Sequence, residues 1–144
     1  MLTIFIILFM KRVITSGIIV GLALFVISYG GLFVAIRLFP HFFEEYISTM
    51  FNSDGSRDFF FYSHVFIISF ALSAFWKRFK TLFKGHSIVR GIEFGGTYAI
   101  VSLLPIFWLS YSTLDITFKM VASWFIYGLI QATVAGIILS KTNP

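Results

Sequence analysis

Four long stretches of the chain are almost free of charge, and they limit strongly what the chain can fold into. The stretches are residues 13–36, 59–76, 92–111 and 120–140. His64 in the second stretch and Glu93 in the third are their only acidic or basic side chains. About 20 apolar residues are enough to cross the hydrocarbon core of a bilayer as an α-helix. The sequence therefore predicts four transmembrane spans at these positions.

All four spans are predicted to be helices and not strands of a membrane barrel. Barrel strands alternate apolar and polar residues over about ten positions, whereas these stretches are apolar at nearly every position. In lipid the backbone must satisfy its own hydrogen bonds, which a helix does within one segment. Because 58% of the 144 residues are hydrophobic and 12% are charged, we expect a single all-α membrane domain over residues 1–144. Pro105 predicts a kink in the third span.

The basic residues are concentrated on one side of the predicted membrane. Eight of the 11 Lys and Arg residues flank the spans on the side of the chain ends, and these are Lys11, Arg12, Lys77, Arg78, Lys80, Lys84, Arg90 and Lys141. The other side carries most of the acidic residues, which are Glu44, Glu45, Asp54, Asp58 and Asp115. The positive-inside rule then predicts a four-transmembrane-helix bundle with both ends in the cytoplasm, as expected for a bacterial plasma membrane.

The connections between the spans suggest where the chain meets the membrane surface. The outer connection, residues 37–58, mixes aromatic and charged residues around a turn and is predicted to lie at the headgroup level. The cytoplasmic connection, residues 77–91, is basic, and lipid headgroups are its expected partner through Lys77, Arg78, Lys80 and Lys84. Residues 1–9 are too short to cross and are interpreted as an interfacial segment or a misassigned start. Nucleic acid is not expected, because the basic residues flank apolar runs instead of forming one stripe.

Small residues recur at four-residue spacing in three of the spans. The positions that we expect to pack helix against helix are Gly17, Gly21, Gly91, Gly95, Gly128, Ala132 and Gly136. Such a face lets two helix backbones approach closely in lipid. The spacing is compatible with packing inside one bundle, which we favour, and with an interface between subunits.

Three ionisable residues are candidates for transport or coupling. Glu93 is the only acid on the cytoplasmic side, and an acid at the start of a span is by default a functional hypothesis. Arg90 precedes it by three positions, so the structural alternative is that Arg90 neutralises Glu93 on one helix face. His64 lies inside the second span and could titrate near neutral pH if it faced a cavity.

Neither catalysis nor a metal site is predicted. The absence of cysteine removes thiol chemistry and thiolate ligands. Nitrogen and oxygen donors that could converge on a metal are present in and after the outer connection, but their spacing matches no known metal motif; they are His41, Glu44, Glu45, Asp58 and His64. The polar run from Ser110 to Thr117 is explained by a capped turn between helices. No cofactor is expected.

The function that the sequence favours is an accessory, structural or interaction subunit of a membrane protein assembly. Its spans hold few polar groups and many packing positions, so other membrane subunits or further copies of the chain are the expected partners. The alternative is a small oligomeric transporter or channel that uses Glu93 and His64. An enzyme is the least supported class, because no acid, base and nucleophile set is recognisable.

Overall fold

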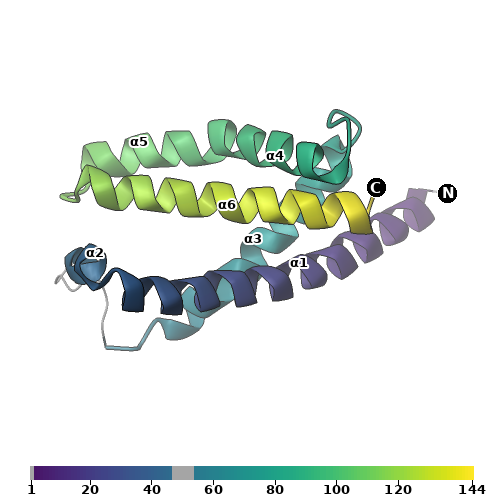
Figure 1. Ribbon diagram of the computed structural model, residues 1–144. Helices are drawn as coiled ribbons and strands as arrows, with labels where there is room; N and C mark the ends of the chain where they lie inside the picture. Colours follow the sequence, from purple (N-terminus) through teal and green to yellow (C-terminus); the bar gives the residue numbers. More distant parts are fainter. Residues whose placement is uncertain (1, 47–53) are drawn as a thin grey trace.

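The computed structural model describes residues 2–46 and 54–144, and the regular structure within these ranges is entirely helical (Figure 1). Four helical segments are long and apolar enough to cross a membrane. They are Phe9–Leu38, Asp58–Phe79, Ser87–Thr113 and Phe118–Thr142. By length and composition, these four helices are what a helical, multi-pass membrane protein requires.

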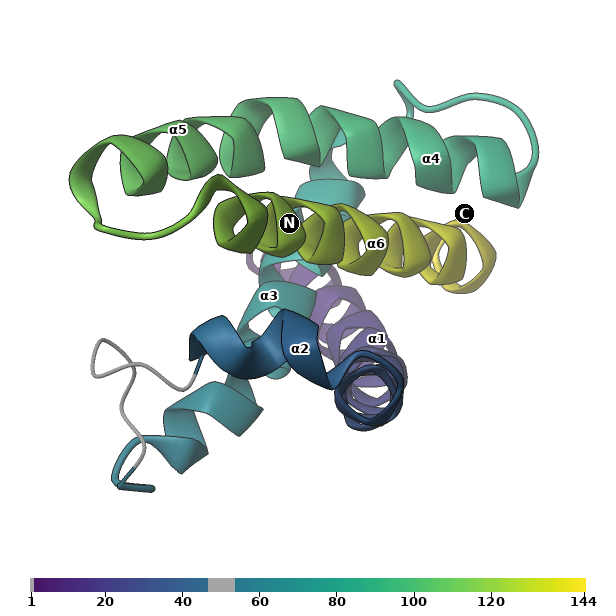
Figure 2. The same cartoon turned by 60° about the vertical axis from the view of Figure 1, so that its left-hand side comes forward.

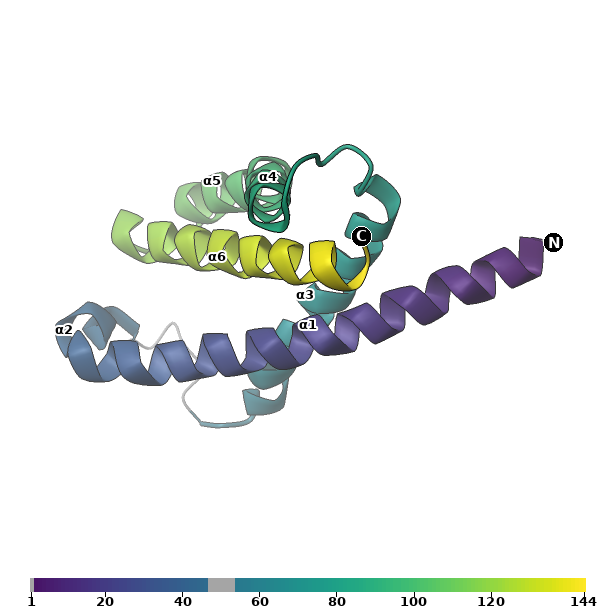
Figure 3. The same ribbon diagram turned by 45° about the vertical axis from the view of Figure 1, so that its right-hand side comes forward.

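The first crossing belongs to helix α1, Leu2–Leu38, which is one continuous helix of 37 residues. At about 1.5 Å per residue this is roughly 55 Å, well beyond the ~30 Å of a bilayer core. Residues 2–9 form the first part of α1 and are not a separate segment. The N-terminal end of the helix extends past the neighbouring helices (Figure 3). Two short helices follow, α2 (Pro40–Phe43) and η1 (Glu44–Tyr46).

The second and fourth crossings are regular helices, α3 (Asp58–Phe79) and α6 (Phe118–Thr142). Thr117 caps α6, since its hydroxyl accepts the Met120 N–H at 3.2 Å. Between α3 and the next helix the chain turns at Gly85, whose φ of +97° is a conformation that favours glycine. A glycine therefore stands where the turn between α3 and α4 needs a positive φ.

The third crossing consists of α4 (Ser87–Tyr98), a π-helical turn η2 (Ala99–Leu103) and α5 (Leu104–Thr113). Within η2 the hydrogen bonds widen, and the Leu104 N–H reaches back to the Ala99 carbonyl. Pro105 follows directly and has no N–H to continue the ordinary ladder. The irregularity expected at Pro105 thus takes the form of a π turn on its N-terminal side.

The helices associate as two pairs, α1 with α3, and α6 with the α4–η2–α5 segment. Figures 1 and 2 show α6 running alongside α4 and α5, while α1 and α3 cross each other. Helix α6 also contacts α1 and α3 and so joins the pairs. The largest fully buried apolar side chains are Leu24, Val20, Val65, Leu72, Trp76, Phe94, Val121 and Leu139.

A polar tether joins the two pairs near the N-terminus of α6. The Glu45 carboxylate accepts from the Thr117 hydroxyl at 2.5 Å and from the Lys119 ammonium at 3.2 Å. The Tyr46 hydroxyl lies 2.8 Å from Ser123 Oγ. These contacts connect η1, which follows α1, to α6 across more than 70 positions of sequence. We call this end of the protein the tether end, and the end that contains the C-termini of α3 and α6 the basic end.

Candidate functional site at the basic end

Arg90 is held against a buried tryptophan. Its guanidinium lies 4.8 Å from the centre of the Trp76 ring, and it donates to the Lys80 carbonyl at 3.3 Å. Trp76 is fully buried, and its ring N–H donates to the Asn143 carbonyl at 2.9 Å. A cation over a desolvated tryptophan contributes up to about 2 kcal/mol. Arg90 therefore links α4 to the C-terminal end of α3, and Trp76 links that end of α3 to the end of α6.

An aromatic cluster supports this arrangement. The Trp76 and Phe83 rings stack with an interplanar angle of 8°, and Phe94 meets both rings edge-on at 5.3 and 5.5 Å. Edge-to-face pairs of this kind add about 0.5–1.5 kcal/mol beyond area burial. Phe83 belongs to the basic connection, so the cluster fixes that loop over the helix ends.

Glu93 and Arg90 serve different partners despite their spacing. The Glu93 side chain is exposed, and its carboxylate accepts the backbone N–H of Lys84 at 3.4 Å. Arg90 points instead to Trp76 and the Lys80 carbonyl. The expected neutralisation of Glu93 by Arg90 is thus replaced by two separate contacts with the basic connection.

His64 lies far from this pair. It is exposed near the N-terminus of α3, twelve positions before Trp76, which is roughly 18 Å along a helix. The structure therefore does not bring the three candidate transport residues together.

The four predicted headgroup residues differ in their surroundings. Arg78 and Lys84 are exposed, and Lys77 is half-buried. Lys80 donates to the Asn143 side-chain oxygen at 3.3 Å and to the Pro144 main-chain oxygen. Burial, together with the positive charges of Lys77, Arg12 and Arg90, lowers the Lys80 pKa. Lys80 therefore contributes to internal structure as well as to surface charge.

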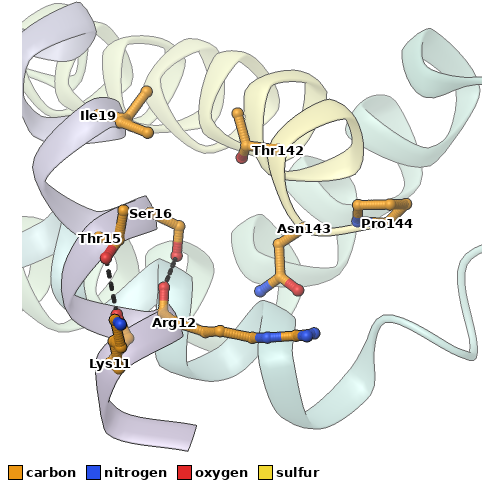
Figure 4. Close-up of a pocket in the computed structure, with 8 residues that line it drawn as sticks. All are labelled: Lys11, Arg12, Thr15, Ser16, Ile19, Thr142, Asn143 and Pro144. Carbon is orange, nitrogen blue, oxygen red and sulfur yellow. Dashed lines mark hydrogen bonds between the residues drawn. The ribbon is translucent and has the colours of Figure 1, made fainter. Parts of the chain in front are cut away.

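An open cavity of about 610 Å³ lies between α1 and the end of α6 (Figure 4). Its lining residues are Lys11, Arg12, Thr15, Ser16, Ile19, Thr142, Asn143 and Pro144. The basic charge of Lys11 and Arg12 is visible in the sequence. The participation of Asn143 is not, because it depends on how the end of α6 meets α1 and α3.

The small residues fall into two groups. Seven predicted packing positions meet other helices of the same chain: Gly17 and Gly21 face Phe70 and Phe66 of α3, Gly91 and Gly95 face α6, Gly128 faces Leu103, Gly136 faces α4, and Ala132 is fully buried. The second group has no neighbour within 4 Å of the position that a Cβ would take, and it consists of Gly30 and Gly31 of α1, which are exposed, and Gly96 of α4, which is half-buried.

A buried polar pair inside the bundle was not anticipated. The Gln131 side-chain amide of α6 donates to Ser28 Oγ of α1 at 3.1 Å, and both residues are buried. Gln131 is the only amide side chain in the fourth span, and this isolation is the one feature of the sequence that could have indicated a buried polar contact. The pair fixes the register of α1 on α6, because an unpaired amide would be costly in lipid.

The possible metal donors of the outer connection separate in the structure. His41 and Glu44 form an exposed pair with 2.6 Å between Nδ1 and Oε1. Glu45 belongs to the tether to α6. Among the described residues there is no group of three or more His, Asp or Glu side chains positioned to hold a metal ion.

Comparisons with protein-family models, curated proteins and solved structures found no match for this chain.

Proposed function

We propose that the protein is a structural or interaction subunit of a membrane protein assembly. It would reside in a bacterial plasma membrane with both chain ends in the cytoplasm. The partner would be another membrane protein or a second copy of the chain, bound side by side within the bilayer.

The observation that carries this proposal is the division of the glycines. Those at the internal helix contacts are used within the chain, whereas Gly30 and Gly31 lie on an exposed part of α1. Gly31 and Ala35 are four positions apart, the spacing that allows a second helix backbone to approach. In lipid such close approach, and not burial from water, drives helix association. This part of α1 is therefore suited to a partner helix.

The transport alternative receives less support from the geometry. It depended on Glu93 and His64, which lie at different places in the bundle. Arg90, the third candidate, is engaged with Trp76.

The proposed orientation rests on the distribution of charge. Lys11, Arg12, Lys80 and Arg90 meet at the basic end, and the acidic residues Glu44, Glu45, Asp58 and Asp115 lie toward the tether end. Under the positive-inside rule the basic end faces the cytoplasm.

Gly31→Leu tests the proposed interface. We expect this variant to fold like the wild type, because the added side chain enters open space, but to lose its partner by collision with the partner helix. The measurement is the mass of the complex extracted gently from native membranes, by light scattering corrected for detergent. Gly96→Leu, at another open glycine on α4, is the matched control and should leave the mass unchanged.

A wild-type protein that is monomeric and without partner would contradict the proposal. So would a Gly31→Leu complex with the mass of the wild type.

A further inference from the structure

We propose that the cavity between α1 and the end of α6 binds the phosphate group of an anionic lipid headgroup. The proposal concerns the basic end of the molecule and is independent of the interaction role assigned to Gly31.

Asn143 holds a hydrogen-bond donor that is not used within the protein. Asn143 is only 5% exposed, lines the cavity, and its side-chain nitrogen Nδ2 has no hydrogen-bond partner. A buried amide N–H without a partner costs free energy, because it has lost its hydrogen bond to water and gained none in return. Figure 4 shows this nitrogen directed into the gap between Asn143 and α1. A ligand acceptor in the cavity would remove the cost.

The orientation of the Asn143 amide is determined by its neighbours. Lys80 Nζ can only donate, and it lies 3.3 Å from Oδ1, so the oxygen must face Lys80. The Trp76 ring N–H holds the Asn143 carbonyl and thereby places the residue. Nδ2 is consequently the donor that is left without a partner beside the cavity. Its two hydrogens select an acceptor and not a donor.

The charge around the cavity selects an anion. Lys11 and Arg12 line the cavity. Lys80 lies close enough to Arg12, Lys77 and Arg90 for their positive charges to repel its own, so positive charge is concentrated here. The hydroxyls of Ser16, Thr15 and Thr142 donate to carbonyls of their own helices, so they do not compete as donors. The groups left to hold an anion are the Asn143 amide and the two basic side chains.

The position of the cavity favours a lipid over a soluble phosphate. It lies between α1 and the C-terminal end of α6, two helices that are long and apolar enough to cross a membrane. Ile19 forms part of its wall, and the adjacent Ile18 and the following Leu22 are exposed on α1. A headgroup in the cavity would therefore leave its acyl chains against apolar helix surface. Basic pockets between transmembrane helices bind anionic headgroups by this combination.

Titration of the detergent-purified full chain tests the assignment. Short-chain phosphatidylglycerol, phosphatidylcholine of equal chain length and inorganic phosphate are added separately, and occupancy is read by native mass spectrometry. We expect saturable binding of one phosphatidylglycerol, at least tenfold tighter than phosphatidylcholine. Inorganic phosphate should bind weakly and compete only at high concentration. The neutral-headgroup lipid controls for acyl-chain adsorption.

Two variants examine the donors. Arg12→Gln, at an exposed position, should weaken phosphatidylglycerol binding about fivefold through loss of one charge. Asn143→Asp keeps the acceptor for Lys80 but places negative charge in the cavity, and should weaken binding by more than tenfold. Lys141→Gln removes a charge from the same end of α6 outside the cavity lining, and is the matched control.

Each outcome has a defined meaning. Equal loss in Arg12→Gln and Lys141→Gln would show diffuse surface attraction and overturn the proposal, as would equal affinity for the two lipids. If inorganic phosphate binds as tightly as phosphatidylglycerol and is lost in both cavity variants, the phosphate site stands and the lipid source is rejected. Failure of the Gly31→Leu test leaves these measurements unaffected, since Gly31 is not part of the cavity lining.

Discussion

Gly95 shows how one missing methyl group controls helix approach. A Cβ at this position would lie 2.2 Å from Thr133 Oγ1 and 2.9 Å from the Thr133 Cα and N. The obstacle is backbone, which cannot rotate away as a side-chain tip can. Gly96, the next residue, has no neighbour within 4 Å. An added methyl group is therefore accommodated at Gly96 but not at Gly95.

Gly95→Ala should therefore lower the free energy of unfolding by about 1–3 kcal/mol, the usual cost of overpacking. Gly96→Ala should be neutral or stabilising by up to about 1 kcal/mol, because alanine is the better helix former. Unfolding by a denaturing detergent, followed by circular dichroism, measures both. Equal effects of the two substitutions would contradict the close α4–α6 contact.

At the scale of elements, η1 and α6 are joined by a carboxylate whose state depends on pH. Hydrogen bonds from Thr117 and Lys119, together with the Lys119 charge, lower the Glu45 pKa below its ordinary value. A lowered folded-state pKa means that the tether stabilises the protein above the ordinary carboxyl pKa. That contribution is lost as the pH falls through the lowered value.

We expect the distribution of distances between η1 and the N-terminal end of α6 to broaden as the pH falls through the lowered Glu45 pKa. The chain has no cysteine, so Glu44→Cys and Asp115→Cys can carry a pair of spin labels without background. Pulsed electron resonance at pH 7 and at pH 3 gives the distance distributions. Glu45→Gln should already broaden the distribution at pH 7, and a narrow distribution there would argue against the tether.

At the scale of the whole molecule, two helix pairs are joined at separate places. Trp76, Lys80 and Asn143 connect α3 to α6 at the basic end, and Glu45 connects η1 to α6 at the tether end. The buried Ser28–Gln131 bond lies between them along α1 and α6. Helix α6 is therefore the common support of the bundle.

The proposed orientation predicts which loops a membrane-impermeant maleimide can label in spheroplasts, whose plasma membrane is intact. Leu114→Cys, between α5 and α6, should be labelled before lysis. Thr81→Cys, between α3 and α4, should be labelled only after lysis. The reverse pattern would place the basic end outside, against the positive-inside rule.

Much of the architecture could be predicted from the sequence, because the length and hydropathy of a span are local properties. The four apolar stretches predicted four helices, and four long apolar helices are present. The π turn illustrates the limit: Pro105 indicated an irregularity, but it did not indicate a widened turn on the N-terminal side of the proline.

The candidate site was much less predictable. Spacing alone paired Arg90 with Glu93, whereas the structure offers Arg90 a buried indole that lies on another helix. Asn143 carried no signal at all, since its importance comes from Trp76, Lys80 and Arg12, which are distant in sequence. The sequence by itself determined the number and nature of the helices and the excess of basic residues near both chain ends. Only the tertiary structure decided which glycines are used, which cation meets Trp76 and where a donor is left without a partner, because these depend on contacts between helices.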